Sequence, residues 1–131
     1  MAYDYREALR NDIKEYINDN FEYIEENVDE PYQNRDEVEQ FLYDELFVND
    51  DVTGNASGSY TFDRAQAREY VEDNMKSAVE AYREFDCIDK FADAITENNY
   101  EAIDVTIRCY LLGEVLGEVL DTIYREYEER G

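Results

Sequence analysis

The chain has 131 residues, the length of a single domain, and its 35 acidic against 12 basic residues give a formal net charge of -23 at pH 7. A surface this negative repels phosphate, which excludes direct nucleic-acid binding through a basic patch and docking on an anionic membrane. Hydrophobic residues make up 44% of the chain, including 13 Tyr and 6 Phe. Disordered acidic tails carry less apolar material, so the composition predicts a folded core.

The start of the chain and its most apolar stretch both bear on location. Residues 1–7 lack the apolar run of a signal peptide, so we expect a cytoplasmic protein. Residues 103–120 are the most apolar, but four charged side chains interrupt them: Asp104, Arg108, Glu114 and Glu118. Burying these charges in hydrocarbon would be costly, so the stretch predicts a core helix and no membrane contact.

Apolar residues at helical spacing predict two helices in the first third of the chain. The first covers residues 3–26, and Pro31 follows its end. Its apolar face consists of Tyr5, Leu9, Ile13, Tyr16, Ile17 and Ile24. A shorter helix is predicted around Val38 and Leu46, with Asn34 or Asp36 available to cap its start.

The rest of the chain is predicted to form a hairpin followed by helices. Turn formers between β-branched and aromatic residues predict a small β-hairpin near residues 51–62. A helix capped by Asp63 is expected over residues 63–85, a short one over 88–95, and a long one after Asn99 to about residue 128.

These elements predict one acidic domain over residues 1–131. The expected fold class is α+β, predominantly α-helical, with four to five helices and the small hairpin. Gly113 and Gly117 lie four residues apart in the last helix, a spacing that favours close approach of a neighbouring helix within the chain. A homodimer seam at these glycines is the alternative.

The acidic residues form ordered rows on two of the predicted helices. The first row follows the spacing i, i+4, i+7, i+11, opposite the apolar face: Glu15, Asp19, Glu22 and Glu26. Neighbours in this row are about 4.5–6 Å apart along the axis, close to the repeat of phosphates along a nucleic-acid strand. The last helix repeats the pattern with Glu114, Glu118 and Asp121.

Such rows favour a surface that imitates the phosphate backbone and binds a basic nucleic-acid-binding protein through electrostatic complementarity. Asp50 and Asp51 in the predicted hairpin are candidate contributors. Three alternatives remain: a merely solvated face, adaptation to high salt, and an adaptor that binds a partner through a helix face and uses its charge for solubility. Salt separates mimicry from the adaptor, because only the mimic loses affinity steeply as ionic strength rises.

The residue types argue against catalysis, metals and cofactors. The chain has no His, and Cys87 and Cys109 lack metal or redox spacing, so we expect two buried free thiols. A calcium-like loop beginning at Asn49 has Tyr60 where the bidentate Glu belongs. Paired carboxylates occur by chance among so many acids. We expect no catalytic residues, no metal site and no cofactor.

Two runs, residues 51–62 (DVTGNASGSYTF) and 104–113 (DVTIRCYLLG), resemble a family of small acidic proteins from bacterial mobile elements and phages. They cover about a sixth of the chain. Proteins of that setting include anti-restriction and anti-CRISPR inhibitors, several of which act as DNA mimics. The resemblance therefore implies a non-enzymatic inhibitor whose target is a host defence protein such as a nuclease, and it assigns no catalytic residues.

Overall fold

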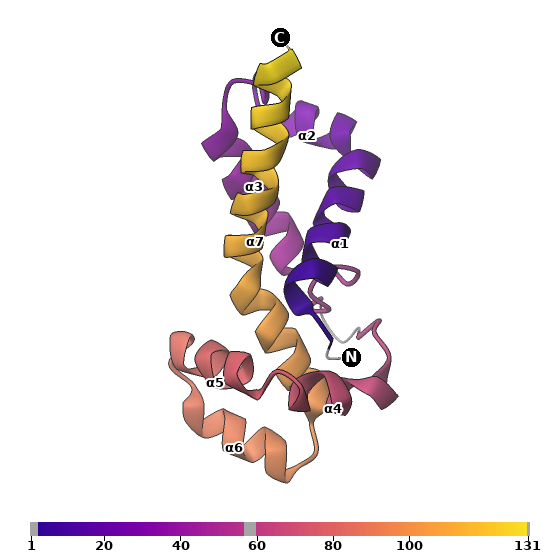
Figure 1. The fold of residues 1–131 in the computed structure, drawn as a ribbon, viewed down its shortest axis with the longest axis vertical. Helices are drawn as coiled ribbons and strands as arrows, with labels where there is room; N and C mark the ends of the chain where they lie inside the picture. The colour runs from indigo at the N-terminus through magenta and orange to yellow at the C-terminus, as the bar shows by residue number, and fades with distance from the viewer. Residues whose placement is uncertain (1–2, 57–59, 131) are drawn as a thin grey trace.

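The computed structural model describes residues 3–56 and 60–130, and within these ranges the chain is all-helical (Figure 1). The helices there are α1 (Tyr5–Asp19), α2 (Phe21–Asn27), α3 (Arg35–Phe47), α4 (Arg64–Glu72), α5 (Met75–Glu84), α6 (Ile88–Thr96) and α7 (Tyr100–Arg130). The expected α+β class with four to five helices is therefore wrong: seven helices, and no strand, occupy the described residues.

Helix α7 runs along most of the length of the molecule and contacts every other described helix except α2 (Figure 1). Helices α1 and α3 lie along its middle and C-terminal parts, whereas α4, α5 and α6 surround its N-terminal part. Buried apolar residues recur every four positions along α7 in two adjacent rows: Ile103, Ile107, Leu111, Val115 and Val119, and Leu112, Leu116 and Leu120. Each such side chain contributes about 1.5–3 kcal/mol when fully buried, so α7 is the spine of the core. The predicted long C-terminal helix is confirmed.

The predicted helix over residues 3–26 is wrong in one respect, because it breaks at Asn20. This residue has φ -124° and ψ 24°, outside the helical region, and ends α1 while it begins α2. Its side-chain amide donates to the Tyr16 carbonyl at 2.9 Å, in competition with the helical backbone. Ile17 before the break and Ile24 after it are both buried, so the spacing of apolar residues continues through a point where the helix ends.

Asn74 breaks the helix predicted over residues 63–85 in the same way. Its amide donates to the Tyr70 carbonyl at 2.8 Å and to the Tyr3 carbonyl at 2.9 Å, and the segment splits into α4 and α5. The predicted cap is confirmed, because the Asp63 side chain accepts from the backbone N–H of Ala65 at 2.9 Å. The short helix predicted over 88–95 is confirmed as α6.

The predicted hairpin near residues 51–62 is absent from the described residues 51–56 and 60–62, and residues 57–59 lie outside the described range. The Asn49 side chain accepts from the N–H of Asp51 at 2.8 Å and of Val52 at 3.1 Å, which forms a turn. The buried Thr53 hydroxyl donates to the Phe47 carbonyl at 3.0 Å, at the end of α3. These side-chain bonds fold the segment onto α3, so its β-branched residues do not extend into strands.

Gly113 and Gly117 lie where α3 crosses α7. A Cβ atom on Gly117 would lie 3.3 Å from a carboxylate oxygen of Glu39, and one on Gly113 would lie 3.5 Å from the Tyr43 ring. The Gly117 carbonyl accepts from Arg35 Nη2 at 3.1 Å. The close approach predicted for these glycines is therefore made by α3 of the same chain.

Candidate acidic interface

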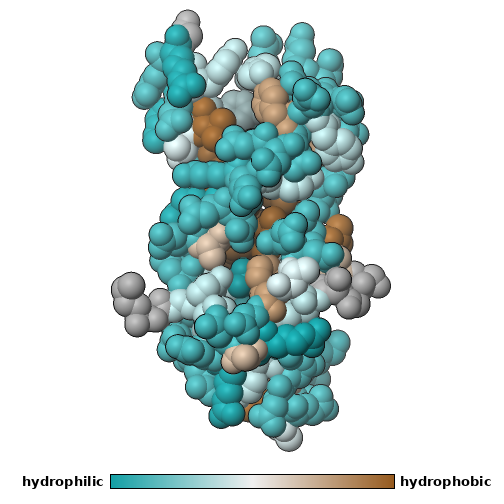
Figure 2. Space-filling view, turned by 90° about the vertical axis from the view of Figure 1, so that its right-hand side faces the viewer, coloured by the Kyte–Doolittle hydropathy of each residue, from teal (hydrophilic) through white to brown (hydrophobic). Residues whose placement is uncertain are grey.

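Helices α1 and α2 present a mainly hydrophilic side of the molecule. Figure 2 views the molecule from the right-hand side of Figure 1, where these helices lie, and shows small apolar patches enclosed by hydrophilic side chains. The four predicted residues of the first row are exposed here: Glu15, Asp19, Glu22 and Glu26. Because α1 and α2 are separate helices, the row bends at Asn20 instead of following one axis.

The first part of the row lines a hollow of about 240 Å³ between α1 and the turn at residues 49–52. Four carboxylates line it: Asp12, Glu15, Asp19 and Asp51. Asn20 and Asn49 supply further polar groups to the same hollow. The structure therefore brings Asp51 beside Glu15 and Asp19, although these residues lie more than thirty positions apart in the sequence.

The second part of the row lines an adjoining hollow at the bend. Its acidic lining consists of Asp19, Glu22, Glu25 and Glu26. Asp19 and Asn20 border both hollows, so the two form one continuous acidic surface. We call this surface the acidic face: Asp12, Glu15, Asp19, Glu22, Glu25, Glu26 and Asp51.

The carboxylates of the acidic face form no ion pairs with the described Lys and Arg residues. Within the described ranges, none of its carboxylates lies within 4.0 Å of a Lys or Arg side-chain nitrogen. Residues 19–34 contain six acidic residues and neither Lys nor Arg. Like charges at i,i+4, such as Glu15 with Asp19, destabilise a helix by a few tenths of a kcal/mol.

Asp12 belongs to the acidic face and was not predicted. It is partly buried, and burial raises the pKa of its carboxyl, as do the nearby Glu15 and Asp51, while Arg108 lowers it. The sequence carried a signal for this residue, because Asp12 extends the alternating spacing of three and four by one step before Glu15.

The second predicted row, on α7, lies in a different environment. Glu114 pairs with Arg6 at 2.8 Å, and Glu118 lies 3.7 Å from both Arg6 and Arg10 of α1. Asp121 pairs with Arg35 of α3 at 2.6 Å. These carboxylates link α7 to its neighbours, so their charges are compensated within the chain.

Asp50 also differs from its neighbour Asp51. Its carbonyl accepts from the Thr61 hydroxyl at 2.6 Å, and its Oδ1 atom is buried without a hydrogen-bond partner among the described residues. Asp51 is exposed and its carboxylate lines the first hollow. Of the two residues proposed for this turn, only Asp51 belongs to the acidic face.

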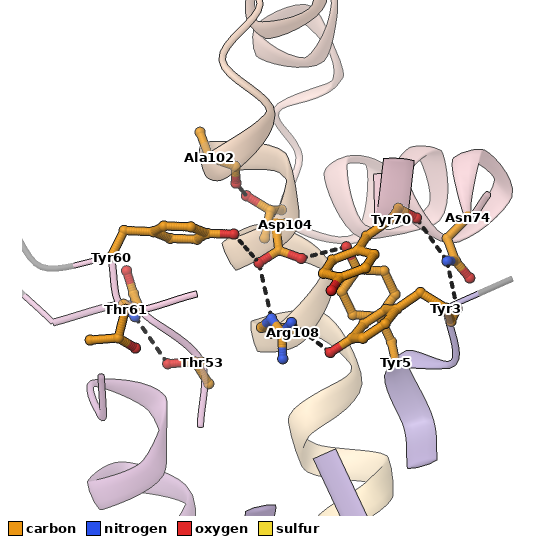
Figure 3. Close-up of polar contacts among 12 residues, drawn as sticks. Tyr3, Tyr5, Thr53, Tyr60, Thr61, Tyr70, Asn74, Ala102, Asp104 and Arg108 are labelled. Atoms are coloured by element: carbon orange, nitrogen blue, oxygen red, sulfur yellow. Dashed lines mark hydrogen bonds and ion pairs between the residues drawn. The ribbon is translucent and has the colours of Figure 1, made fainter. Parts of the chain in front are cut away.

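A second titratable cluster is buried at the N-terminal part of α7 (Figure 3). Asp104 is fully buried and Arg108 is 1% exposed, and their side chains pair at 3.0 Å. Asp104 accepts from the hydroxyls of Tyr5 at 2.5 Å and Tyr60 at 2.8 Å. The sequence shows that Asp104 and Arg108 are four residues apart. It does not show that Tyr3, Tyr5 and Tyr60 bond to this pair, because these tyrosines come from distant segments.

This buried cluster holds the chain together. Arg108 donates to the Tyr3 hydroxyl at 2.8 Å and packs over the Phe62 ring at 3.8 Å from its centroid. Burial raises the pKa of Tyr5 and Tyr60, and the adjacent Asp104 raises it further, so both phenols stay protonated and donate. The cluster thereby joins Tyr3, Tyr5 and Tyr60 to α7 through buried hydrogen bonds.

The cysteines and the metal-binding residue types show no site. Cys87 and Cys109 are free thiols, as predicted, but only Cys109 is buried, whereas Cys87 is partly exposed. Burial raises the pKa of Cys109 to about 11. Across residues 3–56 and 60–130, no three Cys, Asp or Glu side chains are placed to hold a metal ion. No helix in the same ranges is both long and apolar enough to cross a bilayer.

Comparisons with known proteins returned no family model, no curated protein and no solved structure that matches the chain. The resemblance carried by residues 51–62 and 104–113 therefore stays a prediction, and function has to be argued from the surface itself.

Proposed function

We propose that the protein is a non-enzymatic inhibitor that occupies the basic nucleic-acid-binding cleft of a host defence protein by presenting carboxylates in place of phosphates. The observation that carries this proposal is the contrast in charge pairing. The chain compensates the α7 row of Glu114, Glu118 and Asp121 with arginines of α1 and α3, yet places no Lys or Arg nitrogen within 4.0 Å of the acidic face in its described ranges.

The acidic face should be more stable when bound to a cationic partner than when exposed to solvent. Its carboxylates repel one another, and a groove rich in Lys and Arg would relieve that repulsion on binding. The bend at Asn20 makes the face curved, with hollows on either side of Asp19. Cationic side chains of a partner can enter such hollows and meet several carboxylates at once.

The test is affinity capture from a nuclease-treated bacterial lysate at low and high salt, followed by mass spectrometry. The face variant carries Glu15→Gln, Asp19→Asn, Glu22→Gln and Glu26→Gln. A matched control removes the same charge from exposed residues of α5 and α6: Glu80→Gln, Glu84→Gln, Asp89→Asn and Asp93→Asn.

We expect the wild type and the control variant to capture a nucleic-acid-binding protein that elutes with salt, and the face variant to lose it. Equal capture by all three proteins would contradict the proposal. Salt-resistant partners without a nucleic-acid-binding cleft would favour the adaptor function instead.

A further inference from the structure

An apolar pocket opens at the end of the molecule where α1, α2 and α3 meet the C-terminal part of α7. Its volume is about 80 Å³. Its lining is almost wholly apolar: Ile17, Phe21, Ile24, Pro31, Tyr32, Val38, Leu42, Leu120, Ile123, Tyr124 and Tyr127. An apolar cavity of roughly 150 Å³ binds benzene. This pocket is about half that size, so it suits a small aliphatic side chain better than an aromatic ring.

Aromatic side chains form the mouth of the pocket. Tyr32 and Tyr127 stack with their ring centroids 5.1 Å apart, and Phe21 lies 5.7 Å from Tyr32. Tyr32 is 46% exposed and Tyr127 is 50% exposed, so the mouth reaches solvent. The Tyr124 hydroxyl donates to the Pro31 carbonyl at 2.5 Å, which fixes one wall. Ordered tyrosines around a small pocket are typical of the centre of a protein interface.

The negative charge beside the pocket favours a cationic ligand. Phe21 lines both the pocket and the hollow at the bend of the acidic face, so the two are contiguous. An incoming segment therefore meets Glu22, Glu25 and Glu26 next to the pocket. A second copy of this chain brings a net charge of -23 and would be repelled, as would an anionic lipid.

We infer that the pocket accepts one aliphatic side chain from a cationic segment of the partner protein, whose Lys and Arg residues pair with the adjoining carboxylates. This inference rests on the proposed function and deepens it, because it adds an apolar anchor to an interface otherwise governed by charge. The anchor supplies an attraction that persists at high salt and lets the protein discriminate among basic clefts.

The direct test uses short helical Lys/Ala peptides with a single Leu or a single Ala at the centre, titrated into the methyl-labelled protein. We expect the Leu peptide to bind on the order of tenfold more tightly than the Ala peptide. Its methyl shifts should concentrate on the pocket residues Ile17, Ile24, Val38, Leu42, Leu120 and Ile123.

A pocket-filling variant and its control sharpen the test. Ile123→Phe should abolish the preference for Leu, whereas the same change at the exposed Ile88 of α6 should leave it intact. If Ile123→Phe fails to fold by circular dichroism, the Leu and Ala peptides on the wild type decide the matter alone.

Several outcomes would overturn the inference. Equal affinity of the wild type for the two peptides, or no binding of either peptide, would show that the pocket is not an anchor. If the wild type binds both peptides equally and the face variant binds neither, binding depends on charge alone, and the proposed function keeps its support without the anchor. Equal binding of a Leu peptide with Gln in place of Lys would indicate a general apolar ligand. Pocket shifts that follow protein concentration without peptide would assign the pocket to a second copy.

Discussion

The two acidic rows of this protein have the same sequence spacing and opposite charge environments. On α7, Glu114, Glu118 and Asp121 face arginines of α1 and α3 and form ion pairs. Across α1 and α2, Glu15 and the residues that follow it in the row have no such neighbours in the described ranges. The position of a few arginines on adjoining helices thus decides which row is paired within the chain and which row is not.

This contrast predicts that carboxylates of α7 support the folded state and that those of the acidic face do not. The following variants test it from the largest expected effect to the smallest.

The strongest effect is expected at the buried end of α7. Asp104→Asn leaves the Arg108 guanidinium buried without its counter-ion and should lower the free energy of unfolding by about 3–5 kcal/mol. Urea unfolding followed by circular dichroism measures this loss. A change below about 1 kcal/mol would show that the cluster does not hold the chain on α7.

The exposed pairs of α7 should matter less. Glu118→Gln removes the contacts with Arg6 and Arg10, and should lower the free energy of unfolding by up to about 1 kcal/mol at low salt. The loss should shrink in 1 M salt because these pairs are partly exposed. An increase in stability would contradict the assignment of this row to the fold.

The face variant should change the free energy of unfolding in the opposite direction from Glu118→Gln. Neutralising Glu15, Asp19, Glu22 and Glu26 removes two like-charge pairs at i,i+4 and should raise the free energy of unfolding by a few tenths of a kcal/mol for each pair. Thermal unfolding of this variant and the α5–α6 control would compare them at equal net charge. A clear loss of stability confined to the face variant would mean that these carboxylates serve the fold.

The contribution of Asp12 to stability should depend on pH. Because burial raises the pKa of its carboxyl, ionised Asp12 costs stability, a cost that is absent below the unfolded pKa and complete above the folded one. Asp12→Asn should therefore raise the melting temperature slightly at pH 7 and leave it unchanged near pH 3. Equal effects at both pH values would contradict this origin.

The sequence predicted the core better than the helix boundaries. Apolar spacing identified α6, α7 and the inward faces of α1 and α3, because burial follows the helical period. It missed the breaks at Asn20 and Asn74, since the side-chain amide of each asparagine donates to the carbonyl four residues earlier at the end of a helix, while the apolar period continues. The hairpin was wrong because the Asn49 side chain forms a turn with the N–H of Asp51 and the Thr53 hydroxyl donates to the Phe47 carbonyl at the end of α3. Residue type alone does not show that these side-chain bonds replace strand pairing.

The sequence predicted the residues of the candidate site but not their surroundings. Spacing located both acidic rows, yet it could not distinguish them, because ion pairing depends on which helices α7 contacts. Arg6 and Glu114 are more than a hundred positions apart in the sequence. The apolar pocket was beyond prediction for the same reason, since its walls come from four helices and the turn at Pro31.

The most direct test of the central claim is displacement of a fluorescent DNA duplex from the nucleic-acid-binding protein captured by the wild type. We predict that the wild type and the α5–α6 control release the duplex in proportion to their concentration, and that the face variant does not. Equal release by all three proteins, or no release by the wild type, would contradict the claim that the acidic face takes the place of nucleic acid.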